Sequence, residues 1–275
     1  MEDALILFSP YSMEEVKEAA RIMFEETPHT VELLSKKRND TYKVTGQRQT
    51  NVVQRMRILE DLDAVQHNLA LFEEAQGKAG LPPYWQKLHF KWYKGPDGII
   101  WKGMNYLPVR TYEHVQAPLR VREALDIFHN MLSTVTDWKI PAPSYHDTVQ
   151  HLEQLREAVK GQNERVIKAM SIIEDNAHMA EPEQKHCMSH NDCKPDVFAW
   201  CRGRIVALLD LDLLQEGEYS EDINRALQGK RSQYEYAVRL LLDYCTGGYY
   251  FKHRTKRPPD YDLQRVEKIC ATLTL

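Results

Sequence analysis

The sequence predicts an α+β protein with two lobes, a small β-rich N-lobe followed by a larger, mainly helical C-lobe. The first observation is a group of segments with strand-like alternation before residue 107. The second is that apolar residues recur at helical spacing after that point, interrupted by one short β segment near residues 196–212. The third is composition, because 275 residues with 43% hydrophobic side chains can bury a sizeable core.

The N-lobe is expected over residues 1–106 and mixes helices with antiparallel strands. Its predicted elements, in chain order, are a helix (13–26), two strands (41–45 and 51–57), a long helix (60–78) and a hairpin (89–93 and 99–106). The long helix is expected to end at Gly77 and Gly80. A Gly-Pro-Asp-Gly turn at 95–98 predicts the hairpin.

The C-lobe is expected over residues 107–275, after a Leu-Pro-Val hinge at 107–109. Its predicted helices have apolar residues at helical spacing and cover 119–135, 147–160, 163–176 and 231–247. The β segment between them is a hairpin, in which a Cys-Arg-Gly-Arg turn joins strands at 197–200 and 205–209. The layout is that of a small β lobe followed by a helical lobe that carries one hairpin.

Charge and composition exclude several classes of protein. A net charge of −4 and a pI near 6.3 argue against a nucleic-acid partner. No run approaches 18 apolar residues, so no membrane partner is expected. The N-terminus lacks the basic region of a signal peptide, and five cysteines, an odd number, indicate reduced thiols. We therefore expect a cytoplasmic protein.

One group of residues could in principle hold zinc. Within sixteen positions lie two histidines and three cysteines, namely His186, Cys187, His190, Cys193 and Cys201. Their spacing matches no paired Cys-x-x-Cys pattern, and the segment that contains His190 has another interpretation.

The segment with the most chemical information runs from Ser189 to Val197 and is followed, after the hairpin, by Leu208–Asp212. Phosphoryl transfer needs a carboxylate to orient or deprotonate the attacking hydroxyl and oxygen ligands for Mg²⁺. Asp192 and Asp210 border the two strands of the hairpin, so the returning chain brings them together. A lone loop aspartate is usually a turn or cap residue. His-x-Asp, a hairpin and then Asp-x-Asp form a much rarer combination.

These motifs resemble the catalytic loop and metal-binding motif of the aminoglycoside phosphotransferase and choline kinase superfamily. The similarity rests on His-Asn-Asp-Cys-Lys at 190–194 and Leu-Asp-Leu-Asp at 209–212, and it is greatest to the N-acetylhexosamine 1-kinase-like branch. Weaker similarities in the same order extend it over residues 30–225. The resemblance implies a protein-kinase-like fold, ATP and Mg²⁺ as cofactors, and a nucleotide and a small-molecule acceptor as partners.

The resemblance also implies roles for the residues of the two motifs. Asp192 would position or deprotonate the acceptor hydroxyl, and His190 would brace the catalytic loop. Asp210 would bind Mg²⁺, and Asp212 would be a second ligand or a substrate contact. Lys194 would neutralise charge on the transferring phosphoryl group, although an exposed surface lysine is an equally good interpretation.

On the nucleotide side, the resemblance assigns Arg55 to the α- and β-phosphates, with an exposed strand charge as the alternative. The expected phosphate-covering turn has no glycine and offers three cations, Lys36, Lys37 and Arg38. An acidic partner for Arg55 would be Glu73 or Glu74, or, with less support, Glu60.

One position departs from the family pattern. The second metal ligand of the catalytic loop, an Asn, is replaced by Val197, which cannot bind a metal. Asp196 could serve instead, since Mg²⁺ accepts carboxylates. Adjacent residues of a strand face opposite ways, so this substitution requires a local change of backbone path.

The acceptor is less constrained by the sequence. His146 and Asp147 lie at the lobe junction, where an acceptor could reach Asp192, but Asp147 could equally be the N-cap of the 147–160 helix. We expect a Mg²⁺-dependent kinase that phosphorylates a hydroxyl of a sugar or amino sugar. An aminoglycoside or choline-type kinase is one alternative. A catalytically impaired pseudoenzyme or ligand-binding module is the other, because of Val197.

Overall fold

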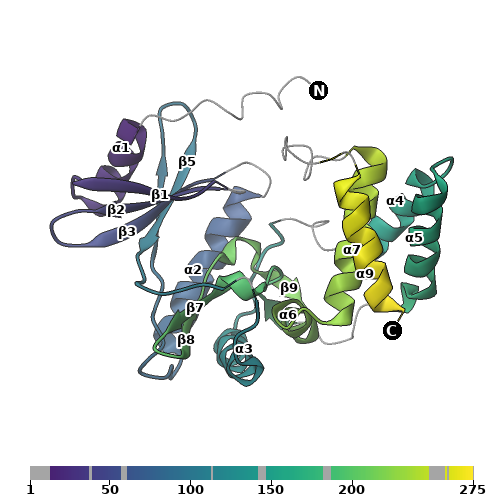
Figure 1. The fold of residues 1–275 in the computed structure, drawn as a ribbon. Helices are drawn as coiled ribbons and strands as arrows, with labels where there is room; N and C mark the ends of the chain where they lie inside the picture. The colour runs from purple at the N-terminus through teal and green to yellow at the C-terminus, as the bar shows by residue number, and fades with distance from the viewer. Residues whose placement is uncertain are drawn as a thin grey trace.

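The computed structural model describes residues 13–36, 39–56, 61–112, 114–141, 147–181, 187–247, 258 and 260–274. Within them the chain is α+β and forms the predicted arrangement of a β-rich N-terminal part and a helical C-terminal part (Figure 1). Across these ranges, the structure contains no helix that is long and apolar enough to cross a membrane.

The N-terminal part is built on an antiparallel five-stranded sheet with the order β1-β2-β3-β5-β4. Its strands are β1 (Thr30–Lys36), β2 (Asp40–Thr45), β3 (Thr50–Arg55), β4 (Phe90–Lys94) and β5 (Ile100–Asn105). Strand β1 is an addition to the prediction. It is an edge strand whose Leu33 and Leu34 are exposed, so it lacks the alternation that identifies a half-buried strand.

Helix α1 (Met13–Phe24) covers one face of this sheet. Its apolar residues pack with Val53 and Trp101 in a small core. Gly103 lies on the same face, because a Cβ there would lie 2.6 Å from the Phe24 ring. Side chains alternate along a strand, so the neighbours of these residues point to the other face of the sheet.

Helix α2 (Leu62–Lys78) packs into the largest core, together with α3 (Pro118–Leu132) and the hairpin of β7 (Phe198–Cys201) and β8 (Arg204–Leu208). Phe72 and Phe128 meet here with ring centroids 6.1 Å apart. This core draws side chains from both sides of residue 106, and it therefore ties α2 to the hairpin below it.

The remaining helices stand at the far end of the molecule (Figure 1). They are α4 (Thr148–Ala158), α5 (Glu164–Asp175), α7 (Lys230–Thr246) and α9 (Tyr261–Leu273), which enclose a second core around Tyr234. Short elements join the two cores: β6 (Cys187–Ser189), which pairs with β9 (Gln215–Gly217), helix α6 (Tyr219–Ala226) and the 3₁₀ turns η2 (Ala177–Ala180), η3 (Pro195–Val197) and η4 (Leu211–Leu213).

Candidate active site

Asp192 lies in the loop between β6 and η3, with 6% of the residue exposed. Its Oδ2 accepts a hydrogen bond from Lys194 Nζ at 2.6 Å. Its Oδ1 is buried and has no hydrogen-bond partner among the described residues. A buried carboxylate oxygen without a donor is costly, so this atom is available to a bound group such as a substrate hydroxyl.

His190 joins the two loops of the site. Its Nε2 donates to the carbonyl of Leu209 at 2.8 Å, and its Nδ1 accepts from the Asp192 amide at 3.3 Å. This pattern of one donor and one acceptor assigns a neutral ring with the proton on Nε2. The buried imidazole thus fixes Asp192 relative to the residue that precedes Asp210.

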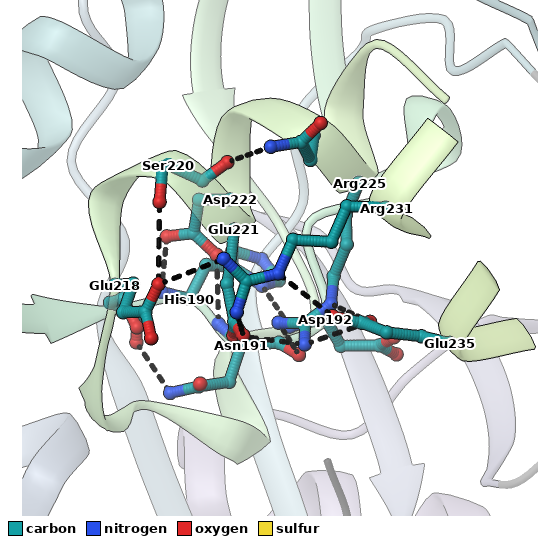
Figure 2. A network of polar contacts seen from close by, with 12 residues as sticks. His190, Asn191, Asp192, Glu218, Ser220, Glu221, Asp222, Arg225, Arg231 and Glu235 are labelled. Carbon is teal, nitrogen blue, oxygen red and sulfur yellow. Dashed lines mark hydrogen bonds and ion pairs between the residues drawn. The ribbon is translucent and has the colours of Figure 1, made fainter. Parts of the chain in front are cut away.

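Asp222, at the start of α6, holds the catalytic loop from below. Its carboxylate accepts from the backbone amides of His190 at 2.7 Å and Asn191 at 3.0 Å (Figure 2). It also pairs with His129 Nε2 at 3.0 Å. Burial alone would raise the pKa of Asp222, but these bonds outweigh it and the pKa is lowered. Burial lowers the pKa of His129, but its bonds to Asp222 and Cys187 prevail and raise this pKa to about 9.

A buried ion-pair network continues from the loop into α7 (Figure 2). Arg225 donates to the carbonyl of Asn191 at 2.9 Å and pairs with Glu221 and Glu235. Arg231 of α7 also pairs with Glu221. Burial raises the pKa of Glu221 to about 7. The network ties the backbone next to Asp192 to two helices.

The predicted metal-binding loop, residues 209–212, follows the end of β8 and is called the metal loop below. The pairing of β7 with β8 returns the chain, and the charges of Asp212 and Asp192 both act on Asp210. Crowding by surrounding protein, together with these two carboxylates, raises the pKa of Asp210. The residue itself is exposed and adopts a left-handed conformation with φ 60°. Non-glycine residues in this region are strained and often functional.

The donor set of this loop fits Mg²⁺ held with a nucleotide. The Asp210 carboxylate has no hydrogen bond or ion pair with another described residue, and it lies close enough to Asp192 for their charges to interact. These two residues mark the predicted ligand cleft between the lobes. The described residues contain no cluster of three or more metal-ligating side chains. Mg²⁺ at phosphate sites typically uses one or two carboxylates, with phosphate oxygens and water completing its shell.

Asp212 has a different environment from Asp210. Its Oδ1 accepts an ion-paired hydrogen bond from Lys102 Nζ of β5, and its Oδ2 accepts from Asn39 at 3.3 Å. Both oxygens are therefore engaged by protein groups, which differs from the predicted role of Asp212 as a metal ligand. Sequence reasoning missed Lys102, although alternation from Trp101 would have placed it opposite the α1 face.

Arg55 lies on the face of the sheet that α1 covers. It pairs in register with Trp101 and with Asp40. It also lies two positions after Val53 on β3, so the two side chains point to the same face of the sheet. The predicted contact with nucleotide phosphates therefore disagrees with the strand register, in which Gln54 takes the opposite face.

The two acidic partners suggested for Arg55 on α2 also bind elsewhere. Glu73 accepts from the Phe90 amide at 3.1 Å, and Glu74 pairs with Lys78. The third candidate, Glu60, lies outside the described residues.

Asp196 and Val197 lie in the 3₁₀ turn η3 instead of a strand. Val197 is 3% exposed and belongs to the largest core, whereas Asp196 is half-buried. Successive side chains of a 3₁₀ turn diverge by about 120°. The backbone thus makes the change of path that Asp196 would need to act in place of the missing Asn.

The other predicted site residues are not brought to this cleft by described contacts. Asp147 is the N-cap of α4, because its side chain accepts from the Gln150 amide at 2.8 Å. The Lys36 side chain, Lys37, Arg38 and His146 lie outside the described residues. Of the possible zinc group, Cys187 instead contacts His129 Nδ1 at 3.5 Å.

Comparison with known proteins places this geometry in a family. The model of the phosphotransferase enzyme family, APH, matches residues 30–256, which is most of the chain. The protein belongs to this family. The match includes both loops of the cleft and the sheet above them. No curated protein is similar enough in sequence to match.

Solved structures with the same fold include three phosphotransferases in complex with ligands. One is the amicoumacin kinase hAmiN with AMP-PNP, Ca²⁺ and Ami, at 12% identity and a TM-score of 0.63, covering 96% of this chain and 93% of that one. Another is the aminoglycoside phosphotransferase APH(4)-Ia with AMP-PNP and hygromycin B, at 8% identity and a TM-score of 0.61, covering 94% of this chain and 98% of that one. The third is the spectinomycin phosphotransferase APH(9)-Ia with ADP and spectinomycin, at 7% identity and a TM-score of 0.61, covering 97% of this chain and 98% of that one. These likenesses establish the protein-kinase-like fold.

Proposed function

We propose that this protein is an ATP-dependent phosphotransferase that moves the γ-phosphoryl group to a hydroxyl of a small molecule. The observation that carries the proposal is that Asp192, with a buried and unpartnered Oδ1, lies close enough to Asp210, with an unpartnered carboxylate, for their charges to interact. A base or orienting group next to a metal ligand is the arrangement that phosphoryl transfer requires.

In this proposal Asp192 orients the acceptor hydroxyl through Oδ1 and takes its proton as the oxygen–phosphorus bond forms. Lys194, bonded to Oδ2, orients the carboxylate and would offset charge on the transferring group. His190 and Asp222 hold the loop at a fixed distance from Asp210. Such preorganisation is the main contribution a protein makes to this reaction.

Mg²⁺ would be held by Asp210, with Asp196 as the proposed replacement for the missing Asn. When bound, the ion supplies charge neutralisation at the nucleotide phosphates. The five cysteines are all free thiols, which fits the proposed cytoplasmic location.

For the acceptor we propose a sugar or amino sugar, following the resemblance to the N-acetylhexosamine 1-kinase-like branch. The neighbours in complex with hygromycin B and with spectinomycin support a small-molecule acceptor as a class. An aminoglycoside or choline-type acceptor is the alternative within the same chemistry.

The test is ³¹P NMR of the protein with Mg²⁺·ATP and a panel of hexoses, N-acetylhexosamines, aminoglycosides and choline. We expect a new phosphate-ester resonance with one member, which disappears in the Asp192→Asn variant. The shift and coupling of that resonance would distinguish an anomeric from an ordinary hydroxyl. Absence of any ester with every acceptor would contradict the proposal.

A second function, nucleotide binding without transfer, is favoured by two observations. Val197 is buried in the core where the family supplies a metal ligand, and Asp212 is bound by Lys102. A pseudoenzyme would be stabilised equally by ATP with and without Mg²⁺. An active enzyme would show greater stabilisation by ATP when Mg²⁺ is present.

A further inference from the structure

Lys102 is a buried, charged side chain in the five-stranded sheet. It lies in the middle of β5, its side chain is 2% exposed, and its Nζ donates to Asp212, itself 8% exposed. A buried ammonium is unfavourable unless its donors are satisfied. The bond to Asp212 uses one of three N–H donors, and the described residues provide no second acceptor for Nζ.

Lys102 projects from the sheet toward the metal loop. Its neighbours on β5, Trp101 and Gly103, face α1, so Lys102 faces the opposite side. Its direct partner on β3 is Gln54, which shares that side. The Lys102 ammonium therefore lies beside Asp212, two positions after the proposed Mg²⁺ ligand Asp210.

We propose that Lys102 is the cation with which this protein binds the nucleotide phosphates, supplied from β5 in place of a basic residue on β3. The inference rests on the proposed function, because it assumes that ATP occupies this cleft. Gln54, which is uncharged, holds the corresponding place on β3, and Arg55 faces α1. Lys102 is thus the described sheet residue whose ammonium contacts the metal loop.

Asp212 then acts as the partner that orients Lys102. In kinases a strand lysine is held by a glutamate of the helix behind the sheet. Helix α2 offers a buried amide at this interface: Asn68 donates to the carbonyls of Lys139 and Leu214. The carboxylate that holds the lysine comes instead from the loop that contains Asp210. Lysine position and metal position are therefore linked through residues 210–212.

The test is isothermal titration calorimetry of the full chain with Mg²⁺·ATP, Mg²⁺·ADP and adenosine. We expect Lys102→Gln to weaken binding of both Mg²⁺·nucleotides by at least about tenfold, and to leave adenosine affinity within about twofold, because adenosine carries no phosphate. Lys91→Met is the matched control. Lys91 lies on the adjacent strand β4 on the α1 face, and its Nζ lies 5.7 Å from the centre of the Phe24 ring.

A charge-swap variant separates phosphate binding from structural support. Gln54→Lys combined with Lys102→Gln returns one ammonium to the same face, next to Asp212, and should restore nucleotide affinity to within a few-fold. It also keeps a charge near Asp212 if Lys102→Gln alone folds poorly.

Unchanged Mg²⁺·ATP affinity in Lys102→Gln would overturn the inference and leave the proposed function intact. Equal losses for adenosine and ATP would also overturn it, because they indicate only structural support. Failure of the unaltered protein to bind Mg²⁺·ATP would overturn both proposals.

Discussion

The two sides of the cleft are built differently. On the acceptor side, the backbone around Asp192 is held by Asp222, Arg225 and His190, all of them buried and hydrogen-bonded to the loop. On the proposed nucleotide side, Val197 stands where the family resemblance places a metal-ligating Asn, and Asp212 is bound by Lys102. Under the proposed function, the group proposed to act on the acceptor is held as the resemblance implies, while the groups proposed to act on ATP are redistributed.

The largest expected effect is on the acceptor side. Asp192→Asn removes the base while keeping the shape of the side chain, and we expect turnover to fall by about 10²–10⁴-fold. Mg²⁺·ATP affinity should stay within a few-fold, because Asp210 and Lys102 are unchanged. Coupled ADP release and calorimetry measure the two quantities. Asp175→Asn, an exposed change on α5, is the control. Full turnover in Asp192→Asn would show that acceptor activation occurs elsewhere.

The next effect tests how firmly the acceptor side is held. Asp222→Asn removes the buried charge that pairs with His129 and receives two loop amides, so we expect a loss of about 3–5 kcal/mol in unfolding free energy. Urea denaturation provides the measurement. The control, Asp126→Asn, alters an exposed bond to Tyr219 and should cost below about 1 kcal/mol. Equal losses in the two variants would remove the special role of Asp222.

The same pair predicts a pH dependence. Folding raises the pKa of His129 from 6.5 to about 9, so the folded state binds more protons between these values. The stabilisation is complete below pH 6.5 and is lost as pH rises through 9, a change of about 3 kcal/mol. Denaturation from pH 6 to 9.5 should show this decline, and His129→Gln should flatten it. A decline of the same size in His129→Gln would assign it to other groups.

The smallest expected effect concerns the nucleotide side. Val197→Asn restores the family residue, but its side chain faces the core, so we expect a loss of about 1–3 kcal/mol in stability. Mg²⁺-dependent turnover should not rise. Thermal melting and a turnover assay test the two expectations together. A gain in Mg²⁺-dependent turnover would mean that residue 197 can face the cleft.

Sequence patterns predicted most of the helices and strands, because the spacing of apolar residues along a segment is a local property of the chain. The 231–247 helix, for example, is observed as α7, Lys230–Thr246. They also brought Asp192 and Asp210 together, since a short hairpin necessarily returns the chain. Helix α9 and strand β1 were not predicted. Strand β1 was missed because it is an edge strand whose Leu33 and Leu34 are exposed.

The groups that sequence reasoning missed are those whose partners are distant in the chain. Lys102 meets Asp212 across 110 positions, and His129 meets Asp222 across 93. The disagreement between the prediction for Arg55 and the strand register has a different origin. Alternation gives two faces for β3, but only the packing of α1 decides which face meets the cleft.

The proposed function implies that the nucleotide side of the site binds ATP through a metal. Its most direct test is calorimetric titration of ATP into the unaltered protein and Asp210→Ala, each with Mg²⁺ and with EDTA. We predict that Mg²⁺ tightens ATP binding to the unaltered protein by at least about tenfold, and that Asp210→Ala abolishes this difference. Equal ATP affinity with Mg²⁺ and EDTA in the unaltered protein would contradict the claim.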